Sequence, residues 1–87
     1  MKSYQLVISS PDGAIFDGEA LNLVVRGANG DLAVMAGHIP FITSVQPCEV
    51  KITLPDETEK TGRVDGGLLT VSEDKVTLLS GNFRWNE

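Results

Sequence analysis

Few side chains in this 87-residue sequence could carry catalysis. His38 is the single histidine and Cys48 the single cysteine, so a metal site built on imidazole and thiolate would have at most one ligand of each kind. Ser44, His38 and Asp31 supply the residue types of a hydrolase triad, but no Gly-x-Ser-x-Gly motif surrounds a serine and nothing in the sequence places the three together. We therefore interpret His38 as a turn residue in the Gly37–Pro40 segment, and we predict no catalytic residue, metal or cofactor.

Carboxylates are more numerous, and three of them stand close together: Asp56, Glu57 and Glu59. Paired carboxylates can act as acid and base. These three share a polar segment with Lys60 between two stretches of strand-like pattern, which is typical of a solvated hairpin tip, so we expect ordinary pKa values and no proton transfer there. The lone cysteine, Cys48, is interpreted as a small buried hydrophobic residue.

The elements that must position these residues are predicted to be strands. Val, Ile and Thr together number 20 residues, against 5 alanines, and β-branched side chains favour strands over helices. Residues 48–54 alternate apolar and polar side chains, and residues 67–72 and 75–80 are typical of a hairpin turning at Glu73-Asp74. Two more rows of inward side chains are expected from Tyr4, Leu6, Ile8 and from Leu21, Leu23, Val25.

Turn-forming groups of Gly, Pro, Asn and Asp recur about every ten residues, which is typical of an antiparallel sandwich or barrel. No segment has helical periodicity, and no linker or repeat is visible. We predict a single all-β domain over residues 1–87. Phe83 and Trp85 near the end are expected either to cover the core or to anchor a partner.

Charge and hydropathy narrow the function classes. Twelve acidic and seven basic residues give a net charge of −5, and the basic residues are scattered, which argues against nucleic acid and against electrostatic binding to membranes. We predict no targeting segment and no membrane span, and the single cysteine fits either a reducing compartment or a protein that is indifferent to redox conditions. The residues alone indicate a soluble, cytoplasmic binding or assembly module, with a free-standing sandwich that binds a small ligand or peptide as one alternative.

Three segments of the sequence, in the same order along the chain, resemble a known protein family. Residues 7–19 (VISSPDGAIFDGE) resemble the opening of the epsilon subunit of F-type ATP synthases. Residues 27–43 (GANGDLAVMAGHIPFIT) are similar to the central signature of that family, Gly-x-x-Gly-Glu-x-Gly-(apolar)-x-Pro-Gly-His-x-Pro. Residues 65–71 with 75–79 resemble its closing hairpin. The resemblance runs from Tyr4 to about Ser80, in the order and spacing of the family.

This resemblance implies a fold and a mechanical function. The family fold is a two-sheet antiparallel β-sandwich of about ten short strands. The implied function is that of a non-catalytic rotor subunit in the central stalk of a proton- or sodium-translocating ATP synthase, where it links the gamma subunit to the c-ring and couples rotation to ATP synthesis. Such a subunit is a monomer on its own and a peripheral membrane protein through its complex, on the cytoplasmic face of the bacterial cell membrane.

The resemblance also assigns contact residues. Asp31 falls where the family has a glutamate facing the c-ring, and Gly30 and Asn29 shape the same loop. The gamma-facing side is implied to include His38, Pro40 and Thr43.

Two positions depart from the signature. Ala33 replaces a glycine and Ala36 replaces a proline, and the same turn is retained only if residue 33 needs no positive φ. The pair of C-terminal helices usual in the family has no counterpart after residue 80. We therefore expect a short form that couples and assembles but neither inhibits rotation through a helical hairpin nor binds nucleotide.

Overall fold

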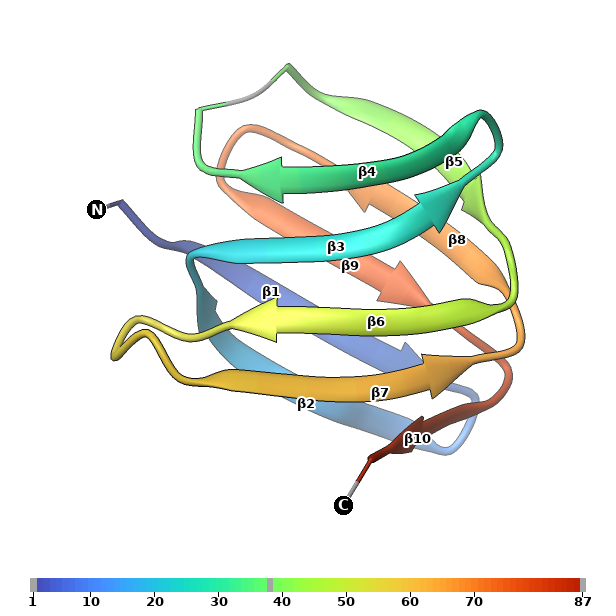
Figure 1. Ribbon diagram of the computed structural model, residues 1–87. Helices are drawn as coiled ribbons and strands as arrows, with labels where there is room; N and C mark the ends of the chain where they lie inside the picture. Colours follow the sequence, from blue (N-terminus) through green and yellow to red (C-terminus); the bar gives the residue numbers. More distant parts are fainter. Residues whose placement is uncertain (1, 38, 87) are drawn as a thin grey trace.

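Ten short strands make up the computed structural model, which describes residues 2–37 and 39–86 (Figure 1). They are β1 (Tyr4–Ser10), β2 (Gly13–Ala20), β3 (Asn22–Gly27), β4 (Gly30–Met35), β5 (Phe41–Val45), β6 (Cys48–Thr53), β7 (Glu59–Val64), β8 (Gly67–Val71), β9 (Lys75–Leu79) and β10 (Phe83–Trp85). In the described part of the chain no helix is long and apolar enough to span a lipid bilayer.

The strands form two layers that pack face to face. β4, β3, β6, β7 and β10 lie side by side in the layer nearer the viewer in Figure 1, and β5, β8, β9, β1 and β2 form the layer behind it. We call these layers the front sheet and the back sheet. Among the described residues, the two sheets are joined at one point, where Gly27 of β3 pairs with Val45 of β5. The predicted two-sheet β-sandwich of about ten strands is confirmed.

The core lies between the two sheets and is built from the alternating side chains of each strand. The predicted rows of Tyr4, Leu6 and Ile8 in the back sheet and of Leu23 and Val25 in the front sheet are buried. Along β6 every second residue is buried, so Cys48, Val50 and Ile52 face the core while the residues between them face outward. Because successive side chains of a strand point to opposite faces, this burial pattern follows directly from the sequence.

One strand pair departs from the antiparallel pattern. β1 and β9 run parallel, with Gln5 opposite Lys75 and Ser9 opposite Leu79. Hairpin-linked neighbours such as β8 and β9 must be antiparallel. β1 and β9 are separated by seven other strands in the sequence, so no hairpin fixes their relative direction. The predicted hairpin turn after β8 is confirmed, and the Ser72 hydroxyl and backbone N–H both donate to the Lys75 carbonyl oxygen, at 2.8 and 2.9 Å.

The last strand closes one edge of the sandwich. Phe83 is buried, and its ring meets that of Trp85 edge to face, with centroids 4.8 Å apart. Trp85 also contacts Phe16 of β2, at 6.1 Å between centroids, so the two rings join the front sheet to the back sheet. The Lys60 ammonium lies 4.5 Å from the centroid of the Trp85 ring, within the range of a cation–π interaction. The alternative in which these aromatic residues cover the core is therefore confirmed.

Candidate partner-binding surfaces

The turn between β3 and β4, together with the first two residues of β4, presents the three residues that the family resemblance assigned to the c-ring. Arg26 and Asp31 are opposite each other in the antiparallel register, and Arg26 Nε lies 3.1 Å from Asp31 Oδ1. Gly30 has a φ of 120°, a conformation that other residues rarely adopt, so glycine is required there. Asn29, Gly30 and Asp31 are all exposed. The turn therefore offers an exposed ion pair with both charges available at the surface.

A groove of about 330 Å³ separates this turn from β5 and is lined by residues 28–32 and 41–43. Thr43, assigned by the sequence to the gamma-facing side, therefore lies across the groove from Asn29, Gly30 and Asp31. Pro40 is exposed immediately before β5, and His38 lies outside the described residues. The structure thus brings the two predicted contact sets next to each other.

The two departures from the family signature are accommodated by the fold. Ala33 lies within β4, opposite Val24 of β3. Among the described residues other than glycine, Glu57 is the one with a positive φ, so Ala33 meets the condition set by the sequence. Ala36 is partly buried and packs against the core.

Two neighbouring rows of residues on the outer face of the back sheet carry no charge across four strands. One row across the sheet consists of Ile42, Thr70, Thr77 and Val7, and the next consists of Ser44, Leu68, Leu79 and Ser9. We call these eight residues the uncharged face. Ile42, Leu68 and Leu79 are 67%, 41% and 47% exposed, although large apolar side chains are normally buried. Sequence analysis did not identify this face, although the outward positions of residues 67–72 and 75–80 show its apolar and hydroxyl composition.

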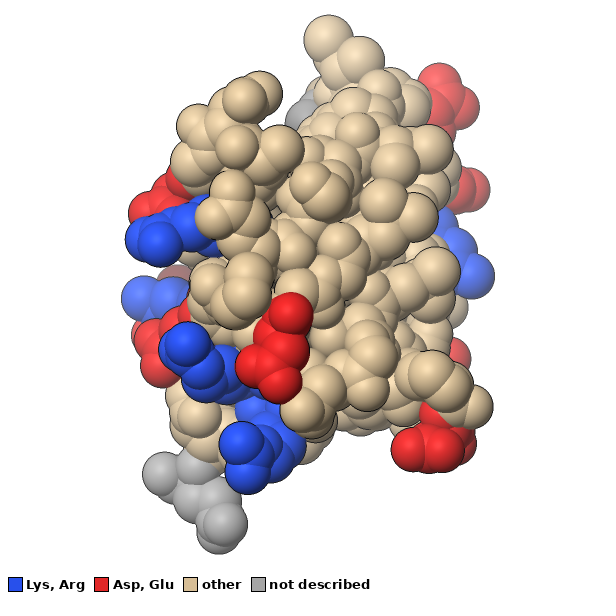
Figure 2. All heavy atoms as spheres, turned by 90° about the vertical axis from the view of Figure 1, so that its right-hand side faces the viewer, with Lys and Arg blue, Asp and Glu red and all other residues tan. Residues whose placement is uncertain are grey.

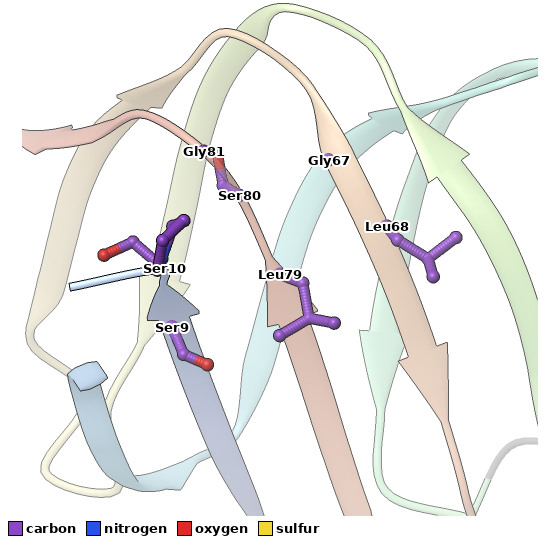
Figure 3. A pocket seen from close by; sticks show the side chains of 8 residues that line it. Ser9, Ser10, Gly67, Leu68, Leu79, Ser80 and Gly81 are labelled. Atoms are coloured by element: carbon purple, nitrogen blue, oxygen red, sulfur yellow. The ribbon is translucent and has the colours of Figure 1, made fainter. Parts of the chain in front are cut away.

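A hollow of about 490 Å³ lies at one end of the uncharged face (Figure 3). Leu68 and Leu79 are directly opposite each other on β8 and β9, and Ser9 and Ser10 of β1 form the far wall. The Ser80 hydroxyl at the rim is already engaged, because it donates within the chain, 2.8 Å from the Gly66 carbonyl oxygen. The hollow therefore presents mainly aliphatic carbon to a partner.

Charged side chains are distributed unevenly around the sandwich. Figure 2 shows one end of it, with most of the Lys and Arg along one side and a broad surface without charge beside them. The outer face of the front sheet carries Arg26, Asp31, Glu49, Lys51, Arg63 and Arg84, all exposed. The two outer faces of the sandwich thus differ in the chemistry that they offer to a partner.

The candidate catalytic and metal-binding residues that the structure describes are not brought together. Ser44 is on the uncharged face, whereas Asp31 is paired with Arg26 on the front sheet. No group of three or more His, Cys, Asp or Glu residues that could hold a metal occurs within residues 2–37 and 39–86. Cys48 is buried, as predicted, and its sulfur accepts the Arg26 backbone N–H at 3.4 Å.

Asp56 and Glu57, in the turn between β6 and β7, and Glu59, at the start of β7, are exposed as expected, but the expectation of an ordinary pKa is wrong for Asp56. Asp56 Oδ1 accepts hydrogen bonds from the Thr58 hydroxyl at 2.6 Å and from the Thr58 backbone N–H at 3.1 Å. Because both bonds favour the charged carboxylate, they hold the pKa of Asp56 below its ordinary value. Its role is to order the turn, and a base with a lowered pKa is poorly suited to proton transfer at neutral pH.

Comparison with known protein families identifies the family to which this β-sandwich belongs. The family described as ATP synthase, Delta/Epsilon chain, beta-sandwich domain matches residues 3–86. The chain belongs to this family. The ATP synthase epsilon chain of Bordetella avium (strain 197N) is 40% identical over 80 residues, which are 92% of this chain and 57% of that relative. The family resemblance inferred from the sequence is confirmed, and the chain spans little more than half the length of this relative.

Solved structures share the fold. A chain of the Euglena gracilis mitochondrial ATP synthase, in its OSCP/F1/c-ring assembly, superimposes with a TM-score of 0.89 at 16% identity, over 95% of this chain and 53% of that one. A chain of the central stalk and c-ring of the Tetrahymena thermophila mitochondrial ATP synthase gives a TM-score of 0.74 at 14% identity, over 91% and 63%. At these identities the similarity establishes the fold of this ATP synthase domain.

Proposed function

We propose that this chain is a non-catalytic subunit of the central stalk of an F-type ATP synthase, in which its sandwich connects the gamma subunit to the c-ring. The observation that carries the proposal is the uncharged face, which exposes Ile42, Leu68 and Leu79 in a member of this family. The solved structures of similar fold, which come from assemblies of the central stalk and c-ring, support it. In this function the chain transmits rotation and performs no chemistry of its own.

The uncharged face suits the partner that must remain bound during rotation, which we assign to the gamma subunit. Exposed apolar side chains around a hollow favour association because their burial removes apolar surface from water. The two opposed leucines are suitably placed to receive an apolar side chain of the partner. We also assign His38, Pro40 and Thr43 to the gamma contact; Thr43 belongs to β5 and Pro40 immediately precedes this strand.

The turn between β3 and β4 suits a polar partner, which we assign to the loops of the c-ring. Asp31 and Arg26 expose one charge of each sign, and Asn29 and Gly30 add backbone and amide groups beside them. Exposed ion pairs contribute little to stability, so both side chains can exchange partners at small cost. The complex places the chain on the cytoplasmic face of a bacterial membrane, and alone it is a monomer.

The test is size-exclusion chromatography of this chain with the gamma subunit encoded in the same genome, and separately with its c-ring in detergent. Leu68→Asp together with Leu79→Asp is expected to abolish binding to gamma, because each aspartate at the centre of an interface costs about 2 kcal/mol or more. Val24→Asp, on the outer face of the front sheet, is the matched control and is expected to leave gamma binding intact.

The c-ring arm of the test uses Asp31→Lys, which is expected to weaken binding to the c-ring and to leave gamma binding unchanged. His38→Glu and Thr43→Lys are expected to weaken binding to gamma. If the unmodified chain elutes separately from both partners at high micromolar concentrations, the family supplies only the fold, and a free-standing ligand- or peptide-binding sandwich replaces the proposed function.

A further inference from the structure

Two arginines face each other on the outer side of the front sheet. Arg63 of β7 and Arg84 of β10 are directly opposite in the antiparallel register, and both are exposed. Residues opposite each other in such a pair have Cα atoms about 4.5–5.5 Å apart. Like charges in this position destabilise a sheet, so the arrangement works against the stability of the isolated domain.

No acidic group in the described residues compensates the two guanidinium groups with an ion pair. The ion pairs formed by residues 2–37 and 39–86 join Arg26 to Asp31 and Lys51 to Glu59. Glu49 is opposite Arg63 on β6, but its carboxylate accepts a hydrogen bond from the Asn86 side-chain amide at 3.0 Å. Within the described residues, neither guanidinium group therefore forms an ion pair that would compete with a partner.

The arginines line an open hollow of about 600 Å³ together with Trp85 and Asn86. Asn86 is held in place, because its backbone N–H donates to the Thr61 carbonyl oxygen at 2.9 Å and its side chain to the Thr61 hydroxyl at 3.1 Å. Trp85 is held by the edge-to-face contact with the Phe83 ring. Two walls of the hollow are thus fixed before any ligand arrives.

We propose that this hollow is a docking site for an acidic segment of a partner protein. The planar guanidinium group binds carboxylates through two parallel hydrogen bonds, and two such groups side by side can bind two carboxylates of one segment. Trp85 is partly exposed and lines the same hollow, while its ring packs against Phe83 and Phe16. Arginine and tryptophan are also the residue types that contribute most to the affinity of protein interfaces.

The observations favour a protein segment over a membrane or a small anion. The chain carries a net charge of −5, and Glu49 of β6 and Glu59 of β7 are exposed on the same sheet, so an anionic bilayer would be repelled over most of the surface. The hollow is an open sheet surface lined by side chains, so a small free anion would remain largely hydrated. A segment that covers the hollow contacts all the residues that line it and gains the contact area that a small anion lacks.

This site lies on the face of the sandwich opposite the uncharged face. It does not rest on the proposed contacts with the gamma subunit or with the c-ring, and its test uses neither of them. The partner is identified by chemistry: an extended or helical protein segment with at least two neighbouring carboxylates.

Trp85 is the single tryptophan of the chain and reports on the hollow directly. The experiment titrates the whole protein with a hexaglutamate peptide and follows Trp85 fluorescence at low and at physiological salt. We expect saturable binding that weakens as salt is added, because screening reduces interactions between exposed charges. The double variant Arg63→Gln, Arg84→Gln is expected to bind about tenfold or more weakly, since it loses the charge-assisted hydrogen bonds.

Lys75→Gln, which removes one positive charge from the other sheet, is the matched control and is expected to bind as tightly as the unmodified chain. Unchanged fluorescence at millimolar peptide, or equal binding by the double variant, would overturn the proposal. Inorganic phosphate that binds as tightly as the peptide would make the hollow a small-anion site instead. Binding of phosphatidylglycerol vesicles that depends on both arginines would make it a lipid site.

Discussion

Gly62 is the position where the packing of the last strand can be tested most directly. This glycine is buried in β7, which pairs with β6 on one side and with β10 on the other. A Cβ added there would lie 2.6 Å from Phe83 Cζ and 2.8 Å from the Arg84 carbonyl oxygen, distances that real Cβ atoms do not tolerate. Its φ is not positive, so alanine is permitted by the backbone and the effect of Gly62→Ala is one of packing alone.

The expected loss of stability can be estimated from these contacts. The Phe83 ring is 9% exposed and has little room to rotate away, and the Arg84 contact is with backbone, so β10 must shift. Overpacking of this kind costs about 1–3 kcal/mol, and the smaller conformational freedom of alanine in the unfolded chain returns about 0.4–1 kcal/mol. We expect a net loss of about 1–2 kcal/mol, which for a domain of this size lowers Tm by about 5–15 °C.

The assay is thermal unfolding of Gly62→Ala beside Gly81→Ala, followed by Trp85 fluorescence. A Cβ at Gly81 would meet nothing within 4 Å, and its φ is also not positive, so this control is expected to raise Tm slightly. Adding Phe83→Leu to Gly62→Ala shortens the side chain in contact and is expected to cost less than the sum of the two single changes. A Gly62→Ala protein as stable as the Gly81→Ala protein would refute the reasoning.

Three further predictions concern polar groups. Burial raises the pKa of Tyr4, so the hydroxyl loses its proton at a lower pH in the unfolded chain than in the folded one. The free energy of unfolding is therefore expected to fall as the pH rises above about 10. Tyr4→Phe is expected to remove this fall, as measured by urea unfolding at alkaline pH. At pH 7 the same variant is expected to cost about 1–2 kcal/mol, because a buried β4 carbonyl oxygen loses its 2.7 Å hydrogen bond. Asp31→Asn breaks the exposed pair with Arg26 and is expected to change the free energy of unfolding by less than about 1 kcal/mol. Arg84→Glu, which places a carboxylate opposite Arg63, is expected to raise that free energy by about 0.2–1 kcal/mol in urea unfolding, and a lower value would contradict the like-charge argument.

Local patterns in the sequence were sufficient to predict most of the strands. The alternation along residues 48–54 corresponds to β6, and the hairpin after residue 67 corresponds to β8 and β9. Both rest on side-chain period and turn chemistry, which act between neighbouring residues. The parallel pairing of β1 with β9 depends on strands far apart in the chain, and no local pattern specifies it.

The candidate surfaces were predictable only in part. The family signature identified Asp31, whose exposure and position at the start of β4 the structure describes. Its partner Arg26 was not predicted, because their opposition requires the register of β3 with β4. The opposition of Arg63 and Arg84, and of Leu68 and Leu79, likewise depends on strand register. Composition showed the scattered basic residues but could not show which of them become neighbours.

The parallel pair of β1 and β9 has a consequence for the order of folding. During synthesis β1 and β2 can form their hairpin early, but the edge of β1 that β9 occupies stays open until residues 75–79 have been made. Long-range pairing of this kind slows folding, because the entropy of closing a large loop is lost before the contacts between the two strands stabilise the chain. A nascent chain therefore carries an unpaired strand edge through most of its synthesis, and this edge is where we expect misassembly with another nascent copy to begin.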